Sequence, residues 1–171
     1  MQEFDLHVEW RGVEIHPETP PEGTPMTKRF RPEDIKRIME HLRSMGAPFG
    51  ITFADRPILS NSRLALQAAE FARDQNLFDP FHTALFAAYF SHGLDIGNVD
   101  VLATIASEAG LDPGALKKAL QSGKYLPRLE AVKEEAALRL VTGVPSFFIG
   151  EKKSVVGAQP LEVFRKALRS A

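Results

Sequence analysis

The stretch Val141-Thr142-Gly143-Val144-Pro145-Ser146-Phe147-Phe148-Ile149-Gly150 decides the fold, because it joins a helical run to a strand through a proline. The run before it is rich in Ala, Glu and Leu, and Gly143 is expected to end that helix. Pro145 stands directly before the apolar run Phe147–Ile149. Proline cannot donate to a sheet ladder, so a strand tolerates it at its first residue, at an edge or at a bulge. The stretch therefore predicts a helix end followed by a strand.

The residues downstream predict a hairpin and a last helix. Glu151-Lys152-Lys153 is expected to form the turn, and Ser154-Val155-Val156-Gly157 the second strand. A helix is expected from about Pro160 to Arg169, since proline suits the first helical turn. Helix, Gly-Val-Pro, hairpin and helix in this order resemble the ending of a thioredoxin-like domain.

The amino-acid sequence of these segments closely resembles that of one family. Thr142-Gly143-Val144-Pro145-Ser146-Phe147-Phe148-Ile149, with Gly157-Ala158-Gln159-Pro160 downstream, resembles the DsbA family. It is most similar to the cytosolic FrnE-like branch, near the 2-hydroxychromene-2-carboxylate isomerases. The resemblance implies an α/β thioredoxin-like fold with a large all-helical insertion. It also implies a single domain over residues 1–171, with residues 1–30 and 141–171 as the thioredoxin-like part and about 31–140 as the insertion and connecting helix.

Composition excludes several classes of function. The 171 residues suffice for one domain with one core, and 44% hydrophobic with 25% charged residues is ordinary for a globular protein. A net charge of −1 offers no basic footprint for nucleic acid and no attraction to a membrane surface. No apolar run approaches the ~18 residues of a membrane span. The N-terminus lacks the pattern of a signal peptide, so a cytoplasmic location is expected.

The sequence contains no cysteine. Thiol–disulfide exchange requires a thiolate that attacks a disulfide sulfur. We therefore expect no catalytic residue for that reaction among these 171 residues, although the family that they resemble performs it.

The N-terminal residues predict a strand and then a loop. Phe4-Asp5-Leu6-His7-Val8-Glu9-Trp10-Arg11 alternates apolar and polar residues, which is typical of a strand. The proline-rich residues 16–25 predict a stiff loop. In the family, a first strand and a Cys-x-x-Cys or Ser motif precede this point, and the sequence starts after them. We therefore expect a homodimer built around the strand Phe4–Arg11, whose edges would lack a neighbour.

A block of helices separates the two ends of the chain. Capping residues, prolines and apolar periodicity predict helices that begin at about Pro32, Ser60 or Asn61, Asp79, Asn98, Asp112 and Leu126. The last of them is expected to reach Leu140. Trp10 and the aromatic residues between Phe81 and Phe90 are expected in the core.

Val144, Pro145 and Ser146 are the candidate binding residues. The resemblance implies a cis Val144–Pro145 bond, whose neighbouring backbone groups pair with an extended peptide, a protein thiol or glutathione. The alternative is a trans proline that only starts the strand. Asn61 has two interpretations: it caps a helix, or it lines a pocket as an asparagine does in the isomerase-like relatives.

Histidine spacing predicts no metal site. His7, His16, His41, His82 and His92 include no pair at helical spacing, whereas zinc requires converging ligands. Glutathione is the one cofactor that the resemblance allows.

Three functions remain open. The first is a DsbA-type thiol–disulfide oxidoreductase whose catalytic segment is not in this sequence. The second is a glutathione-dependent isomerase or transferase, which needs Ser in the upstream motif. The third is a domain without catalysis that binds a peptide or a partner at Val144–Pro145. As an activity of these 171 residues, the third is favoured.

Overall fold

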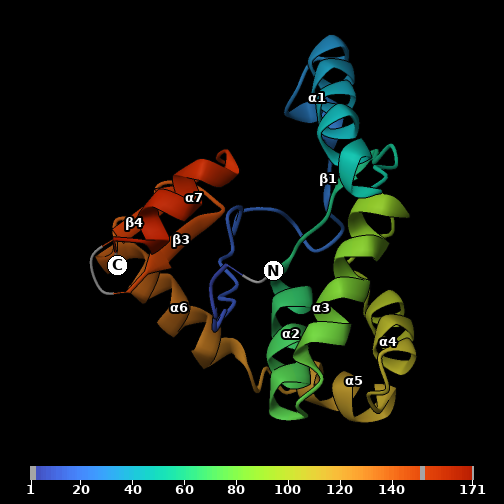
Figure 1. Ribbon diagram of the computed structural model, residues 1–171. Helices are drawn as coiled ribbons and strands as arrows, with labels where there is room; N and C mark the ends of the chain where they lie inside the picture. The colour runs from blue at the N-terminus through green and yellow to red at the C-terminus, as the bar shows by residue number, and fades with distance from the viewer. Residues whose placement is uncertain (1–2, 151–152, 171) are drawn as a thin grey trace. The chain divides into compact units, whose positions relative to one another are not determined.

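The computed structural model describes residues 3–150 and 153–170 (Figure 1). The chain divides into two compact units, Met1–Val132 and Lys133–Ala171. The first unit is mainly helical, and the second holds a two-stranded sheet and the last helix. No helix within the described ranges is long and apolar enough to cross a membrane.

The helices of the first unit begin close to the predicted positions. Its elements are β1 (Thr24–Pro25), η1 (Met26–Lys28), α1 (Pro32–Gly46), η2 (Ala47–Phe49), β2 (Ile58–Leu59), α2 (Arg63–Asp74), α3 (Phe78–Phe86), η3 (Ala87–Ser91), α4 (Val99–Glu108), α5 (Pro113–Gln121) and the start of α6 (Leu126–Leu138). Side-chain capping explains two starts. Asn98 accepts hydrogen bonds from the amides of Asp100 and Val101, and Asp112 accepts them from Gly114 and Ala115.

Helices α2 to α5 pack around one apolar core. Phe81, Leu102 and Leu116 are completely buried in it, and Tyr125 is 1% exposed. The ring of Tyr125 meets that of Phe71 edge to face, with 6.3 Å between centroids. This core holds α2 and α3 together, and an open hollow lies beside them.

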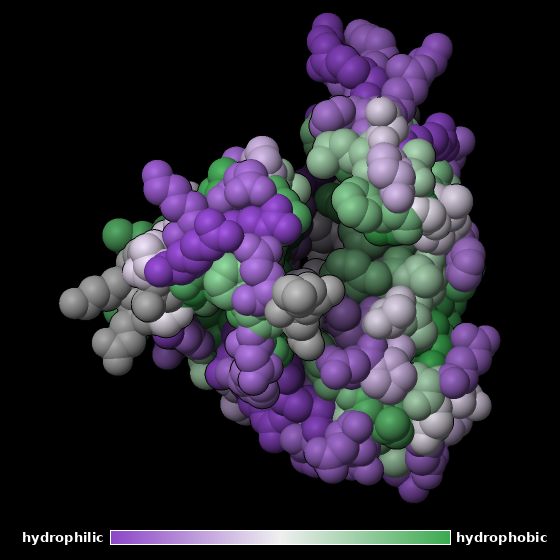
Figure 2. Space-filling view, in the orientation of Figure 1, coloured by the Kyte–Doolittle hydropathy of each residue, from purple (hydrophilic) through white to green (hydrophobic). Residues whose placement is uncertain are grey.

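Helix α1 is amphipathic but packs loosely. Met39 is buried, whereas its neighbour Ile38 is 38% exposed. Figure 2 shows a hydrophilic far end of α1 and hydrophobic surface beneath it on the same unit. Ile38 remains exposed because few elements of the unit cover this helix.

An aromatic row runs along α3 into η3, where the helix widens to a π-helical turn. Phe78, His82, Phe86 and Phe90 are spaced four residues apart, and each ring contacts the next, with centroids 4.4–5.6 Å apart. Part of this row is at the surface, since Phe86 is 48% exposed. The expectation that the aromatic residues between Phe81 and Phe90 lie in the core is thus correct for Phe81, which is completely buried, and wrong for Phe86.

The predicted strand Phe4–Arg11 is absent: this segment has no regular secondary structure. It lies along the first unit without a strand beside it, and the Trp10 carbonyl accepts a hydrogen bond from Arg73 at 2.8 Å. Alternating apolar and polar residues give an extended segment one apolar face, but a strand also requires hydrogen bonds to a neighbouring backbone. The predicted loop, in turn, contains β1, which pairs antiparallel with β2 through Thr24 with Leu59 and Pro25 with Ile58.

The second unit contains the predicted hairpin. Its elements are the end of α6, β3 (Ser146–Ile149), β4 (Lys153–Val156) and α7 (Leu161–Leu168). β3 and β4 are antiparallel, with Ser146 opposite Val156. Phe147 on β3 meets Phe164 on α7 edge to face, with 4.9 Å between ring centroids. Residues 151 and 152 of the predicted turn lie outside the described residues.

Helix α6 ends earlier than predicted. Leu140, and not Gly143, has the left-handed backbone at the helix end, with φ +54°. The amide of Val141 bonds to the Ala136 carbonyl, and that of Leu140 to the Ala137 carbonyl. This is a Schellman motif, a pattern that usually places glycine at the left-handed residue. The backbone hydrogen bonds thus end the helix before Gly143 is reached.

Candidate functional site

Val144 and Pro145 end the connection that leads from α6 into β3, and Ser146 is the first residue of β3. The Val144–Pro145 peptide bond is cis, the isomer that the family resemblance implies. The Pro145 carbonyl accepts a hydrogen bond from the Gly157 amide at 2.8 Å, and the Ser146 hydroxyl donates to the Gly143 carbonyl at 2.6 Å. These two bonds hold the connection against the hairpin.

Val144 differs from its two neighbours. Its side chain is exposed, at 48%. None of the described residues forms a hydrogen bond with its backbone amide or carbonyl. β3 begins two residues later and has β4 as its one strand neighbour among those residues. A free donor and a free acceptor therefore lie beside an open strand edge.

Asn61 lies before α2 in the first unit, and both of its polar side-chain atoms have backbone partners. Its Nδ2 donates to the Thr19 carbonyl at 2.6 Å, and its Oδ1 accepts from the Arg63 amide at 2.9 Å. The second bond gives a partner to one of the backbone amides at the start of α2 that have none within the helix. These contacts match the capping interpretation, and a role for Asn61 in a ligand pocket stays a prediction.

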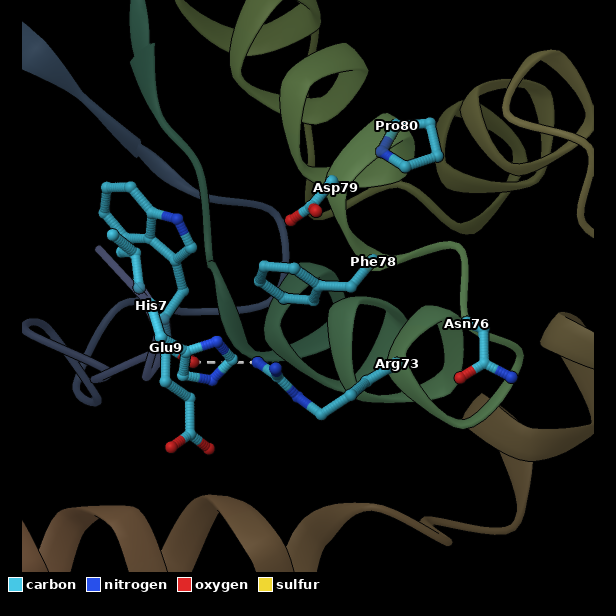
Figure 3. A pocket seen from close by; sticks show the side chains of 9 residues that line it. His7, Glu9, Arg73, Asn76, Phe78, Asp79 and Pro80 are labelled. Atoms are coloured by element: carbon cyan, nitrogen blue, oxygen red, sulfur yellow. Dashed lines mark hydrogen bonds between the residues drawn. The ribbon is translucent and has the colours of Figure 1, made fainter. Parts of the chain in front are cut away.

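An open hollow of about 400 Å³ lies where residues 7–10 pass the end of α2 and the start of α3 (Figure 3). Besides these four residues, its wall consists of Arg73, Asn76, Phe78, Asp79 and Pro80. Asn76 takes up the left-handed backbone, with φ +57°, that ends α2. That turn brings the start of α3 round to face the N-terminal segment.

Arg73 fastens the N-terminal segment to α2. Its Nη2 donates to the Trp10 carbonyl at 2.8 Å, and its Nε donates to Glu70 at 3.3 Å. The guanidinium also lies over the ring of Phe78, 4.0 Å from the centroid. Two of its N–H donors and one face of its guanidinium are therefore already engaged.

His82 stacks behind the wall of the hollow. Its ring centroid is 4.9 Å from that of Trp10 and 5.1 Å from that of Phe78. Burial lowers the pKa of His82, the Asp79 carboxylate opposes that shift, and the Arg73 cation adds to it. The stack thus favours the neutral imidazole.

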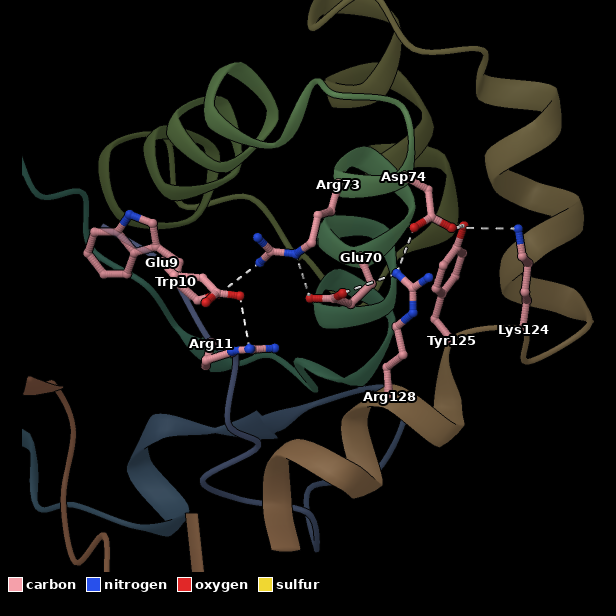
Figure 4. A network of polar contacts seen from close by, with 9 residues as sticks. All are labelled: Glu9, Trp10, Arg11, Glu70, Arg73, Asp74, Lys124, Tyr125 and Arg128. Carbon is pink, nitrogen blue, oxygen red and sulfur yellow. Dashed lines mark hydrogen bonds and ion pairs between the residues drawn. The ribbon is translucent and has the colours of Figure 1, made fainter. Parts of the chain in front are cut away.

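A polar network joins α2 to the start of α6 (Figure 4). Arg128 donates to Asp74 at 2.7 Å and to Glu70 at 3.4 Å, and the buried Tyr125 hydroxyl donates to Asp74 at 2.9 Å. The hydrogen bond from Arg128 is the largest cause that lowers the pKa of Asp74. This cluster is a structural tie, since its groups are committed to one another.

With this geometry established, comparison with known proteins decides the family. The sequence profile described as DSBA-like thioredoxin domain matches residues 1–169. The chain belongs to the DSBA-like thioredoxin family.

Relatives of this DSBA-like chain agree with the assignment. It is 29% identical over 167 residues to the uncharacterized protein YwbO of Bacillus subtilis (strain 168), a match covering 96% of this chain and 82% of YwbO. The fold is similar to that of the probable DsbA oxidoreductase SCO1869 from Streptomyces coelicolor, with a TM-score of 0.84 and 22% identity over 92% of this chain and 72% of that one. A putative protein disulfide isomerase from Nitrosomonas europaea follows, with a TM-score of 0.67 and 19% identity over 87% and 78%.

These likenesses confirm the fold class, a DsbA-like thioredoxin fold with a helical insertion. Within this DSBA-like chain, three of the four candidate binding residues are consecutive, with Val144 and Pro145 just before β3 and Ser146 at its start, and Asn61 belongs to the first unit. No group of three or more His, Asp or Glu residues suited to a metal ion occurs in the described parts of the chain.

Sequence reasoning missed the hollow of Figure 3 entirely. Its wall combines residues 7–10 with Arg73 and with the start of α3, which are far apart in the sequence. The one local signal was the set of aromatic residues between Phe81 and Phe90, which, like Trp10, were expected in the core. The segment opposite was expected to be a strand, so nothing placed the two together.

Proposed function

We propose that this DSBA-like chain binds an extended polypeptide segment, or the tripeptide glutathione, at Val144–Ser146. The observation that carries the proposal is the backbone of Val144, whose amide and carbonyl have no hydrogen-bond partner among the described residues. In an antiparallel pair, two opposed residues exchange both of their N–H···O bonds. Val144 can therefore hold one residue of an extended ligand at two points.

The surroundings of Val144 support a strand-like ligand. Peptides often bind by adding a strand to an open sheet edge, where main-chain hydrogen bonds give affinity. β3 begins two residues after Val144 and has an edge without a strand among the described residues. Phe148 on β3 is 41% exposed and offers apolar contact beside that edge. A ligand that pairs with Val144 can thus continue along β3.

Chemistry limits what happens after binding. The names of the two similar structures refer to an oxidoreductase and a disulfide isomerase. Exchange proceeds through a mixed disulfide, which needs a thiolate on the enzyme, and these 171 residues contain no cysteine. We therefore infer that this chain binds a peptide or protein thiol at Val144–Ser146. Its own side chains do not supply the thiolate that disulfide exchange requires.

The test follows the amide of Val144 by NMR during titration with a short extended peptide and, separately, with glutathione. We expect a saturable shift of the Val144 amide and its neighbours. Val144→Pro removes the amide hydrogen, and Val144→Ala retains it. One lost hydrogen bond is expected to weaken binding about five- to tenfold in Val144→Pro, while Val144→Ala retains most of the affinity.

Two further measurements make the outcome decisive. Circular dichroism shows whether Val144→Pro is folded, and a peptide methylated at one backbone nitrogen removes a hydrogen bond from the ligand side instead. The purified chain should also reduce no insulin disulfides in the presence of dithiothreitol beyond the rate without protein. A Val144 amide that does not move with either ligand would contradict the binding proposal, and measurable turnover would contradict the chemical limit.

A further inference from the structure

The hollow of Figure 3 has the size of a small-molecule site. Its volume of about 400 Å³ lies within the roughly 300–1,000 Å³ of ligand pockets in proteins. Trp10 and Phe78 contribute aromatic walls, and Phe78 and Asp79 at the start of α3 point toward the N-terminal segment (Figure 3). Such a mixture of aromatic surface and a few polar groups is common in ligand sites.

The charges of this hollow are not equally available. Arg73 is committed to Glu70, to the Trp10 carbonyl and to the ring of Phe78. Glu9 is paired with Arg11 at 2.9 Å. By contrast, the Asp79 carboxylate forms neither a hydrogen bond nor an ion pair with a described residue. The charge left without a partner is therefore negative.

Trp10 adds a surface that suits a positive ligand. One side of its indole stacks on His82 at 4.9 Å, and the residue remains 43% exposed. Tryptophan has the aromatic face that attracts cations most strongly, and the attraction grows when the cation leaves water. An exposed indole and an unpaired carboxylate in one hollow both favour a cation over an anion.

We propose that this hollow binds an organic cation, an ammonium or guanidinium group carried on an apolar body. Asp79 takes the charge, and Trp10 contacts the cation or the apolar body beside it. The site lies in the first unit and does not involve Val144, so it stands or falls independently of the function proposed above.

Trp10 makes the test direct, because it is the only tryptophan in the sequence. Its fluorescence is followed while the full chain is titrated with 2-phenylethylamine. The neutral 2-phenylethanol and the anionic 3-phenylpropanoate have the same apolar body and serve as charge controls. We expect a saturable change with the amine and at least about tenfold weaker binding of the alcohol and the carboxylate.

Asp79→Asn should weaken binding of the amine about tenfold or more, because a charge-assisted contact is lost. Asp100→Asn is the matched control. Asp100 is likewise an acid in the first turn of a helix, α4, but it pairs with Lys117 and does not line the hollow. Equal affinity for amine and alcohol, tighter binding of the carboxylate, no saturable signal, or an unchanged affinity in Asp79→Asn would each overturn the proposal.

Discussion

At the scale of a single residue, the Asp74 carboxylate holds several side chains together. It accepts hydrogen bonds from the Tyr125 hydroxyl and from Arg128, and Lys124 lies 3.8 Å away (Figure 4). The Tyr125 side chain is buried, so its hydroxyl depends on this partner. The contacts connect the end of α2 with the first turn of α6.

Removing the Arg128 side chain should weaken the dependence of the free energy of unfolding on pH in the acidic range. Its bond lowers the pKa of Asp74. A lowered carboxyl pKa stabilises the fold above the ordinary value of about 3.9, and this stabilisation is lost as the pH falls through the lower, folded value. Both side chains are partly exposed, so we expect Arg128→Met to cost about 0.5–1 kcal/mol at neutral pH.

Urea unfolding checks this prediction at neutral pH and at about pH 3. The difference between Arg128→Met and the parent should be present at neutral pH and shrink in acid. Lys117→Met is the control, because Lys117 pairs with an exposed carboxylate on Asp100. A difference that is equally large at both pH values would show that packing of the Arg128 stem matters more than its charge.

At the scale of an element, two helix starts provide a matched experiment. Asn98 caps α4 with hydrogen bonds to two amides, whereas Ser62, at the corresponding position of α2, makes no side-chain capping bond. Asn98→Ala should therefore lower the free energy of unfolding by about 1 kcal/mol. Ser62→Ala should leave it nearly unchanged. Thermal unfolding of both variants measures these changes. Equal losses of stability in the two variants would contradict the capping role of Asn98.

At the scale of the whole molecule, unpaired backbone and exposed apolar residues predict self-association. Leu6 is 53% exposed in an N-terminal segment without a strand neighbour, and a hairpin of two strands such as β3–β4 is marginal by itself. We expect a homodimer through the N-terminal segment, with a mass near twice 18.9 kDa by light scattering.

Leu6→Glu should shift this dimer toward monomer, because it puts a charge into the apolar face of the segment. Phe49→Glu is the control: Phe49 is even more exposed, at 79%, but lies in η2, away from that segment. A parent chain that remains monomeric at every concentration measured would show that the N-terminal segment is satisfied within one molecule.

Features that depend on nearby residues were predicted well. Asn98 and Asp112 are capping residues that act within three positions, and both start helices as expected. The proline at the start of β3 and the hairpin also lie where the sequence indicates. The binding candidates Val144–Ser146 were inferred from the resemblance of this same stretch to the DsbA family, and their ligand stays a proposal.

By itself the sequence determined the family, the helix starts and the hairpin, because each depends on residue type or on short-range backbone geometry. Tertiary structure alone decided the conformation of residues 4–11 and the existence of the hollow. Arg73 reaches the Trp10 carbonyl across 63 positions, and Tyr125 reaches Asp74 across 51. Such contacts exist only after the helices have packed, since a strand needs a neighbouring backbone and a hollow needs walls from distant segments.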